Sequence, residues 1–544
     1  MDYMFRVDDI KLKVPFTDEQ KELKASLLRL FRIPEDGIRE LKILRRSLDA
    51  RKKPDLYYVY SVAFDVHGEL RKKLLKSPAA KKALKPYQPV NYRFPEIAHL
   101  PQGDEKRPLI VGAGPAGLFC AYMLAKAGLR PILVERGEKI AERDKKVNAV
   151  FEGAQPDPES NVAFGEGGAG TFSDGKLFSQ TSDREGLHTE VFRIFAEFGA
   201  PSQILYDAHP HIGTDILKSV VTNIREETER LGGEFLFGTR FERPLIRDER
   251  ICGALLMRKG EHTERECAAL VLCTGHSARD TFRALSECGI RMEPKAFAAG
   301  FRVQHEQAFI DRNQYGEGYE SKKLPAAEYK LTAKSSSGRG VYSFCMCPGG
   351  YVINASSAPG ELVVNGMSYH GRASGIANSA IVVSVGPEIT GGGLFDGMRL
   401  QEKMERAAFA AAGGRIPLQC LGDFAEGRME TAMRGVEPQI KGSFAYAPLN
   451  GILPEALEKD IIEAFEVFGR TIPSFGDPQT LLAAVESRTS SPLRIVRDEK
   501  GSGSVKGLFP CGEGAGYAGG ITSAAVDGIR AAGRVAAFLS ESGL

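Results

Sequence analysis

The sequence predicts an α/β protein in which a mixed α+β domain is inserted into a doubly wound sheet of the Rossmann type, with a small α+β domain before it. Three observations predict this fold. Residues 108–137 have the pattern of a strand, a glycine turn, a helix and a second strand. Residues 291–504 change to long alternating segments, and residues 505–544 return to a short strand, a glycine turn and a helix. We expect the outer two segments to share one sheet.

The glycine turn of the first segment carries most of the prediction. Leu109, Ile110 and Val111 form an apolar run typical of a buried parallel strand, which leads directly into Gly112-Ala113-Gly114-Pro115-Ala116-Gly117. The first glycine permits the tight turn, the second lets a pyrophosphate approach, and the third lets the helix pack on the strand. The next strand ends at Glu135, where a carboxylate accepts the hydroxyls of an adenosine ribose and disfavours a 2′-phosphate. The turn therefore predicts dinucleotide binding.

Composition sets the class of protein. The 544 residues are 42% hydrophobic and 26% charged, which is ordinary for a globular chain of roughly three to four domains. No apolar run approaches a membrane span, and the first residues lack the apolar core of a signal peptide, so we expect a cytoplasmic location. The nine cysteines are scattered without a CxxC pair, which indicates reduced thiols and excludes a zinc ribbon. We expect no metal site.

The front of the chain is a basic module. Residues 1–107 hold 24 Lys and Arg against 16 Asp and Glu, a net charge of +8. We expect a strand over 2–13, a helix capped by Thr17, strands over 39–46 and 56–66, and helical sequence over 69–85. The basic cluster consists of Arg45, Arg46, Arg51, Lys52 and Lys53. A solvated face explains this cluster better than RNA binding, because no RNA-binding signature accompanies it.

A second glycine segment follows over residues 161–177. Gly167, Gly168, Ala169 and Gly170 leave a backbone that can approach a flat ring or a second phosphate, and the next residues, Thr171, Ser173 and Lys176, add donors. A flexible loop is the alternative. We prefer the binding interpretation because the donors follow the glycines directly, whereas a plain linker is polar and repetitive.

The remaining order of elements resembles a known family. A helix over 214–231, a strand over 234–242 and two further apolar runs lead to Thr274-Gly275. With these, the chain resembles FAD-dependent oxidoreductases of the glutathione reductase type, and within them an uncharacterised bacterial FAD-dependent dehydrogenase family. The strings that carry the resemblance are VGAGPAGL, NVAFGEGGAGTFSDGKL, HPHIGTD, VLCTGHSARD, FCMCPGGYVINASS, ESRTSSPLRI and GLFPCGEGAGYAGGITSAAVDGIRAA.

The resemblance implies non-covalent FAD and assigns residues to it. Phe241 would contact adenine through its backbone. After the last strand, the turn at Gly512 would place the carboxylate of Glu513 near the ribityl or pyrophosphate region. The helix that opens at Gly520-Ile521-Thr522 would face the flavin N1 and O2 edge, where a helix N-terminus stabilises negative charge. The full expected cofactor set also includes Arg136, Arg143, Thr274 and Gly275.

The expected domains are 1–95 (basic α+β), 96–107 (linker), 108–290 (first FAD-binding part), 291–504 (substrate domain, with helices near 374–381, 396–412 and 454–468) and 505–544 (second FAD-binding part).

Candidate catalytic residues stand outside the cofactor motifs. His209 and His211 could bind a substrate anion or transfer protons, with a structural hydrogen-bonding role as the alternative. Cys345 and Cys347 would face one side of a strand as a candidate redox dithiol, and a buried structural pair is the default interpretation. Arg488 lies in a dense set of donors before the last motif, where a capped turn is the alternative.

The function expected from these residues is an FAD-dependent dehydrogenase or reductase. Hydride would move between flavin N5 and an unidentified small-molecule substrate. No second strand with GxGxxG and a terminal acid is found, so a separate NAD(P)H domain is not expected and any NAD(P)H would dock transiently. Two alternatives stay open: an NAD(P)H-using FAD monooxygenase, and an RNA-associated flavoprotein that uses the basic N-terminal module. The sequence does not decide the oligomeric state.

Overall fold

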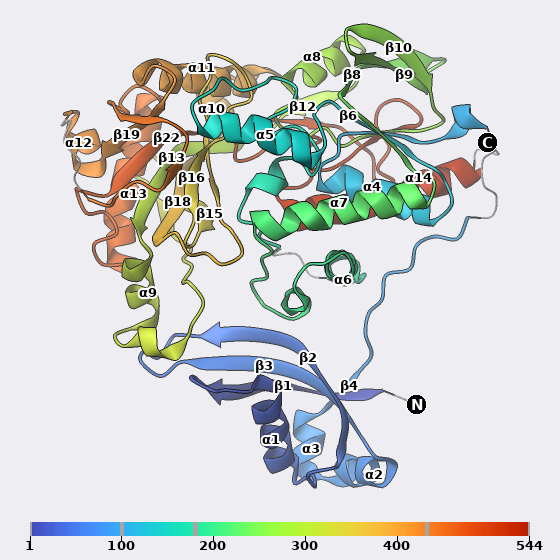
Figure 1. The fold of residues 1–544 in the computed structure, drawn as a ribbon, viewed down its shortest axis with the longest axis vertical. Coiled ribbons are helices and arrows are strands. Elements are labelled where there is room, and N and C mark those ends of the chain that lie inside the picture. The colour runs from blue at the N-terminus through green and yellow to red at the C-terminus, as the bar shows by residue number, and fades with distance from the viewer. Residues whose placement is uncertain (1–2, 98–102, 178–182, 430–434, 542–544) are drawn as a thin grey trace.

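The computed structural model describes residues 3–97, 103–177, 183–429 and 435–541. Residues 98–102 of the expected linker lie outside these ranges. Figure 1 shows a small domain at the N-terminus and a larger body in which the domain expected to hold the substrate, residues 291–504, lies next to the FAD-binding sheet. We call residues 291–504 the substrate domain for this expectation. Within the described ranges, no helix combines the length and apolar character that crossing a membrane requires.

The N-terminal domain is a four-stranded antiparallel sheet with strand order β2-β3-β1-β4. Its elements are β1 (Met4–Lys13), α1 (Glu19–Phe31), β2 (Ile38–Asp49), β3 (Tyr57–Val66), α2 (Gly68–Lys76), α3 (Pro78–Ala83) and β4 (Lys85–Tyr87). The expected strands are confirmed, but the cap of α1 is Asp18 and not Thr17, since the Asp18 side chain accepts from the Lys21 amide at 3.0 Å. The expected helix over 69–85 is broken at Ser77, which caps α3.

The FAD-binding sheet is parallel, with strand order β24-β11-β5-β6-β7. Its strands are β5 (Leu109–Val111), β6 (Ile132–Glu135), β7 (Glu234–Phe237), β11 (Leu270–Leu272) and β24 (Leu508–Pro510). Alternate residues face opposite sides, so Ile110 packs in one core and Leu109 and Val111 in the other. Both faces are buried, which explains the continuous apolar runs. The predicted doubly wound fold is confirmed.

Helices cover one face of this sheet, and a β-meander and a short helix cover the other. The first face carries α4 (Pro115–Lys126), α6 (Leu187–Glu197), α7 (Thr214–Arg230) and α14 (Ile521–Glu541). The second carries β8 (Thr239–Arg247), β9 (Arg250–Arg258), β10 (Glu261–Glu266) and α8 (Arg279–Glu287). A Cβ on Gly528 of α14 would overlap the carbonyl oxygen of Ala116 in α4. Glycine therefore lets the early and the terminal helix pack closely.

The substrate domain is built on a seven-stranded sheet of order β14-β15-β18-β13-β22-β19-β21. These strands are β13 (Phe297–Glu306), β14 (Thr332–Lys334), β15 (Gly340–Cys347), β18 (Ile376–Val385), β19 (Ile416–Cys420), β21 (Phe444–Tyr446) and β22 (Leu481–Glu486). The expected helix over 374–381 is wrong, because residues 376–381 are part of β18. Strand β18 pairs with β13 and β15 and is buried on both faces. Its apolar run is therefore that of a central strand and not of a helix.

The other two expected helices of this domain are confirmed as α11 (Asp396–Ala411) and α13 (Glu455–Thr471). A three-stranded sheet joins β16 (Tyr351–Asn354), β17 (Val364–Met367) and β20 (Ile440–Lys441). A two-stranded sheet joins β12 (Met292–Pro294) and β23 (Leu493–Ile495), near both domain boundaries expected from the sequence. We keep those boundaries as a proposal.

Candidate functional site

Three neighbouring parallel strands end at one edge of the FAD-binding sheet. Gly112 follows β5, Thr274 follows β11 and Gly512 follows β24. A Cβ on Gly112, whose φ is +103°, would overlap the carbonyl oxygen of Cys273. The chain therefore turns sharply here, and only glycine tolerates the turn. The carboxyl edge next to the point where the strand order reverses is the usual ligand site of such sheets.

The first helix presents free donors to this edge. Helix α4 begins with Pro115, and Gly114 before it makes no side-chain cap, so no side chain occupies the first amides. A Cβ on Gly114 would meet only the Cα of Gly168, at 3.9 Å, whereas a Cβ on Gly117 would overlap the carbonyl oxygen of Gly112. Gly117 is thus needed for packing, and Gly114 leaves space for a ligand.

The second glycine segment lies against the first. A Cβ on Gly168 would lie 2.9 Å from the Cα of Gly114, and one on Gly170 would lie 3.1 Å from Cγ1 of Ile521 at the start of α14. Gly168 precedes a short 3-10 helix, η2 (Ala169–Phe172), and Gly170 lies within it. The early and the terminal glycine clusters therefore meet through the segment over 167–170, although they are far apart in the sequence.

The two expected hydroxyl donors of this segment are engaged with the segment itself. Thr171 donates to the Glu166 carbonyl at 3.4 Å, and Ser173 donates to the Gly170 carbonyl at 2.7 Å. A Cβ on Gly167, whose φ is +84°, would overlap the Thr171 hydroxyl. These hydroxyls fix the shape of the loop, and their contact with the cofactor stays a prediction.

Glu135 connects the glycine segments. Its Oε2 accepts from the Ala113 amide at 2.8 Å, and its Oε1 accepts from the amides of Gly137 and Gly165 at 2.9 Å each. A carboxylate offers about four acceptor positions, so one remains for a ribose hydroxyl. The expected ribose contact stays a prediction, and the structure adds that Glu135 holds the phosphate turn in place.

The two arginines expected near the cofactor are already engaged by protein groups. Arg143 is fully buried, and its guanidinium donates to the carbonyls of Asn161, Val162, Glu166 and Gly168. These bonds position the second glycine segment, and the expected contact of Arg143 with the cofactor stays a prediction. Arg136 pairs with two carboxylates, those of Glu159 and Asp280, at 2.9 Å each.

The expected adenine and ribityl contacts stay predictions, and the structure gives the surroundings of these residues. Phe241 is buried in the core of the β-meander, which leaves only its backbone for a ligand. Glu513 lies 3.2 Å from Nδ1 of His276, beside the turn at Thr274-Gly275. Gly520 has no atom within 4 Å of an added Cβ, and Thr522 ties the start of α14 to the Leu177 carbonyl at 2.7 Å.

These residues fit FAD. The side-chain oxygen of Thr274 is buried without a partner at the carboxyl edge, where a ligand donor or a water would satisfy it. The open space at Gly114 and the uncapped start of α4 suit a pyrophosphate. The start of α14 lies across the second glycine segment from this turn and suits the part of the flavin that becomes negative. Sequence reasoning missed Asp527, whose carboxylate accepts from the Gly512 amide at 2.7 Å.

A polar cluster of Lys176, His209, Glu328 and Arg372 lies next to this cradle. Residues 175–177 pair with residues 210–212 through backbone bonds, and Lys176 is directly opposite His211. The Lys176 ammonium donates to the Met346 carbonyl in β15 and lies 3.6 Å from the Glu328 carboxylate. The cluster therefore joins the cofactor loop to the substrate domain.

Glu328 is the centre of the cluster, although the sequence pattern did not identify it. Its carboxylate lies 3.0 Å from Arg372 and 3.3 Å from Nδ1 of His209. Burial favours the neutral acid, but Lys176, His209 and Arg372 together hold the pKa of Glu328 well below its usual range. Arg372 also pairs with Asp174 at 2.6 Å. Glu328 is thus a fixed anion between three nitrogen groups.

The two predicted histidines differ in environment. His209 has a side chain that is 64% exposed, so solvent reaches its ring. His211 stacks on His370 with ring centroids 5.2 Å apart, and burial lowers the pKa of His211 to about 4. His211 is therefore neutral near pH 7. Its Nε2 is buried without a partner.

The two predicted cysteines point to different surroundings. Pairing of β15 with β18 shifts between Phe344 and Cys347, and Cys345 at this irregularity has a φ of +43°. Cys345 is exposed, whereas Cys347 is buried and donates to the Cys345 carbonyl at 3.3 Å. Burial raises the pKa of the Cys347 thiol to about 11, which keeps it protonated near pH 7. Both are free thiols.

Arg488 lies in a separate buried network. It donates to both oxygens of Glu405, at 2.9 and 2.7 Å, and to Ser357 at 2.5 Å and Ser277 at 3.3 Å. Arg279 of α8 binds the same Glu405. Since the network joins the FAD-binding part to the substrate domain, it fits a positioning role for Arg488. A catalytic role stays an untested prediction.

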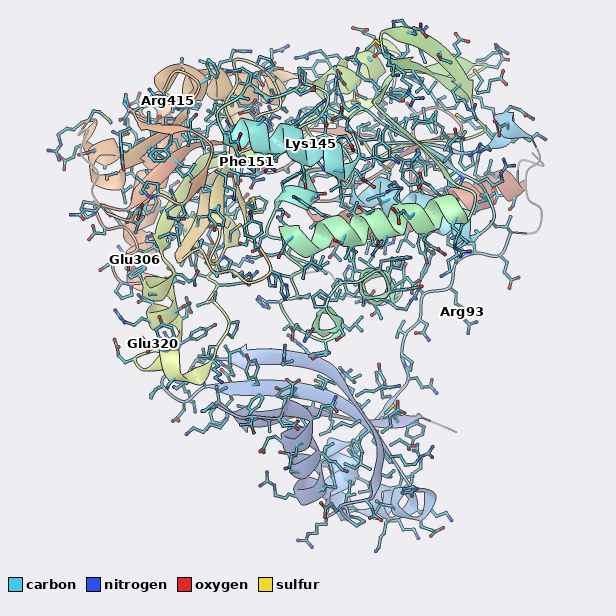
Figure 2. All side chains as sticks on the ribbon, in the orientation of Figure 1. Arg93, Lys145, Phe151, Glu306, Glu320 and Arg415 are labelled. Atoms are coloured by element: carbon cyan, nitrogen blue, oxygen red, sulfur yellow. The ribbon has the colours of Figure 1, made fainter. Side chains whose placement is uncertain are left out.

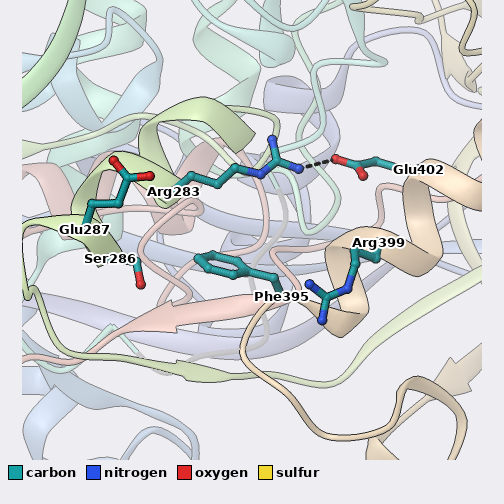
Figure 3. Close-up of a pocket in the computed structure, with 6 residues that line it drawn as sticks. All are labelled: Arg283, Ser286, Glu287, Phe395, Arg399 and Glu402. Atoms are coloured by element: carbon teal, nitrogen blue, oxygen red, sulfur yellow. Dashed lines mark hydrogen bonds and ion pairs between the residues drawn. The ribbon is translucent and has the colours of Figure 1, made fainter.

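Two cavities of the described structure lie outside the polar cluster. One of about 390 Å³ lies between α8 and α11, where Arg283 pairs with Glu402 at 2.7 Å and Phe395 is among the lining residues (Figure 3). Another of about 260 Å³ is lined by Arg136, Gly238 and Arg240 near the carboxyl end of β6. Neither cavity is lined by the predicted catalytic residues.

Comparisons with known proteins agree with this site. Residues 296–489 match the family described as "FAD-dependent protein, C-terminal domain-like". Residues 110–145 match a NAD(P)-binding Rossmann-like domain, and residues 4–65 match a domain of unknown function. An uncharacterised protein of Clostridium beijerinckii is 40% identical over 536 residues, which cover 97% of each chain.

Solved structures show more distant likeness. A geranylgeranyl bacteriochlorophyll reductase-like protein of Thermoplasma acidophilum is 12% identical with a TM-score of 0.37, over 80% of this chain and 79% of that one. The L-amino acid deaminase of Proteus myxofaciens is 12% identical with a TM-score of 0.32, over 83% and 94%. Such scores transfer no activity. The chain belongs, with the Clostridium beijerinckii protein, to a family of FAD-dependent proteins.

Proposed function

We propose that the protein is an FAD-dependent dehydrogenase or reductase that moves a hydride between flavin N5 and an organic substrate held under the domain over 291–504. The observation that carries this proposal is the polar cluster of Lys176, Glu328 and Arg372. It connects the C-terminal end of the second glycine segment, residues 161–177, to two segments of the substrate domain. Bound FAD would supply a reversible two-electron acceptor, and the protein supplies orientation and charge.

Each residue of the cluster has a role that follows from its contacts. Lys176 places a cation six residues after Gly170 of the glycine cradle, where it stabilises negative charge on a reacting group. Glu328 holds Lys176 and Arg372 in place as a permanent anion. His209 is the exposed member that takes up or releases the proton that accompanies the hydride. The substrate is a small molecule, and NAD(P)H would dock transiently.

The test is anaerobic reduction of the yellow protein by a panel of metabolites and both nicotinamides, followed as bleaching of flavin absorbance. We expect at least one compound to bleach wild-type protein. Glu328→Gln should slow the bleaching by about tenfold to a hundredfold, because Lys176 and Arg372 lose their fixed position, while FAD content is unchanged. Glu320→Gln, a change of an exposed glutamate in the short helix over 319–322, should have no effect. Bleaching of Glu328→Gln at the wild-type rate would contradict the proposal.

A further inference from the structure

Arg46 of β2 fixes the N-terminal domain to one segment of the FAD-binding part. Its amide donates to the Tyr206 carbonyl and its carbonyl accepts from the Ala208 amide, both at 2.8 Å. Its guanidinium forms a bidentate pair with Asp207, at 2.7 and 3.0 Å. A third bond, at 2.9 Å, goes to Glu19 of the same domain. Arg46 thus engages three consecutive residues, 206–208, through both backbone and side chain.

This contact is directly next to the polar cluster. His209 is the next residue, and its Nδ1 lies 3.3 Å from the Glu328 carboxylate. Two residues further, His211 pairs with Lys176 of the cofactor loop. The position of residues 206–208 therefore determines where His209 stands and supports the strand pairing behind Lys176.

A second contact of the N-terminal domain reaches the substrate domain. Val14 and Leu56 are buried in the same core as Ile310 of α9 (Gln307–Tyr315). Lys322, in the short helix after α9, donates to the Pro54 carbonyl at 2.6 Å. In Figure 2 Glu320 marks the end of this region that lies against the N-terminal domain, and Glu306 marks the opposite end.

Helix α9 in turn holds the segment that carries Glu328. Asp311 accepts from the Ala327 amide at 2.7 Å, and Tyr315 donates to the Pro325 carbonyl at 3.0 Å. Gln307 donates to the Ala327 carbonyl at 3.1 Å. The N-terminal domain therefore contacts one segment that positions His209 and one element that positions Glu328.

We infer that the N-terminal domain is a brace that holds the His209 segment of the FAD-binding part and the Glu328 segment of the substrate domain at the spacing where the two side chains meet. Arg46 is its main positioning residue. The brace itself does not depend on the proposed function, but its effect on flavin reduction does. The brace also explains part of the basic cluster, because Arg46 binds Asp207 and Lys53 donates to the Asn313 carbonyl.

Hydrogen exchange on the full-length, FAD-bound protein tests the brace without a substrate. In Arg46→Ala we expect amides in 203–212 and 325–331 to exchange about tenfold faster, because the anchor of both segments is weakened. Amides in 109–135 and the FAD content should not change. Arg45→Ala removes the same charge from the neighbouring exposed position and should leave all these segments unchanged. Arg46→Lys keeps the charge without the bidentate fork, and should restore part of the protection.

Two results would overturn the inference. One is amide exchange in 203–212 and 325–331 that is no faster in Arg46→Ala than in Arg45→Ala. The other is an equal increase of the exchange rate in 109–135.

A second readout uses flavin bleaching. If Arg46 acts through the contact of His209 with Glu328, Arg46→Ala should slow bleaching about fivefold in wild type but cause no further loss in Glu328→Gln. Additive losses would contradict that route. Wild-type bleaching by Glu328→Gln, with altered exchange in Arg46→Ala, would reject the proposed function and keep the brace.

Discussion

The buried ion pair of Arg302 and Glu486 in the seven-stranded sheet allows the loss of unfolding free energy to be predicted for a single substitution. Arg302 is fully buried in β13, and Glu486 in β22 binds it with two bonds, at 2.9 and 3.1 Å. The remaining donors reach the side chains of Asn378 and Asn365 and the carbonyl of Cys345. Burial disfavours the cation, but Glu486 outweighs it and the pKa of Arg302 rises above its usual value.

Glu486→Gln removes the compensating charge and leaves the guanidinium buried. Breaking one side of a buried pair costs about 3 to 5 kcal/mol of unfolding free energy. For a domain of this size, about 1 kcal/mol lowers the melting temperature by roughly 2 to 4 °C, so we expect a fall of roughly 10 °C. Since Arg302 binds the Cys345 carbonyl, the same variant should increase the labelling rate of Cys345 by a thiol reagent.

Differential scanning calorimetry of FAD-bound protein measures this effect. The matched control is Arg302→Met with Glu486→Leu, which removes both charges and should be less destabilised than Glu486→Gln alone. A melting temperature of Glu486→Gln within about 2 °C of wild type would refute the reasoning, because it would mean that the buried charge is compensated by other groups.

Two further predictions concern pH. Burial and the neighbouring Glu405 raise the pKa of Glu361 to about 7. Between pH 4.5 and about 7 the folded chain therefore binds a proton that the unfolded chain has released. The free energy of unfolding falls as pH rises through this window. Glu361→Gln should flatten chemical unfolding profiles across that window, and an unchanged slope would contradict the assignment. Burial lowers the pKa of His305 to about 4, so stability is lost as pH falls from about 6.5 to about 4, and His305→Gln should resist acid better than wild type in the same assay.

The sequence was sufficient for the cofactor cradle because each part of it is local. A strand, a glycine turn and a helix are read from consecutive residues, and the apolar runs of β5, β11 and β24 match a sheet buried on both faces. The same reasoning failed for β18, whose apolar run has no period that separates a central strand from a buried helix.

The polar cluster could not be predicted in full, because its members come from four separate segments of the chain. His209, His211, Cys345 and Cys347 were expected as separate candidates, and the structure brings them near Lys176. Glu328 lies in irregular chain before β14, where no spacing or motif identifies it. Only the fold shows that one carboxylate serves Lys176, His209 and Arg372.

The most direct test of the FAD site is the flavin content of Gly114→Val. Gly114 has an extended φ of −72° that any residue adopts, and its Cβ position meets only the Cα of Gly168, at 3.9 Å. The side chain should therefore leave the melting temperature of FAD-free protein unchanged and block the pyrophosphate. We predict that purified Gly114→Val is colourless and folded, whereas wild-type protein binds FAD stoichiometrically. A yellow Gly114→Val variant with wild-type FAD content would contradict the site.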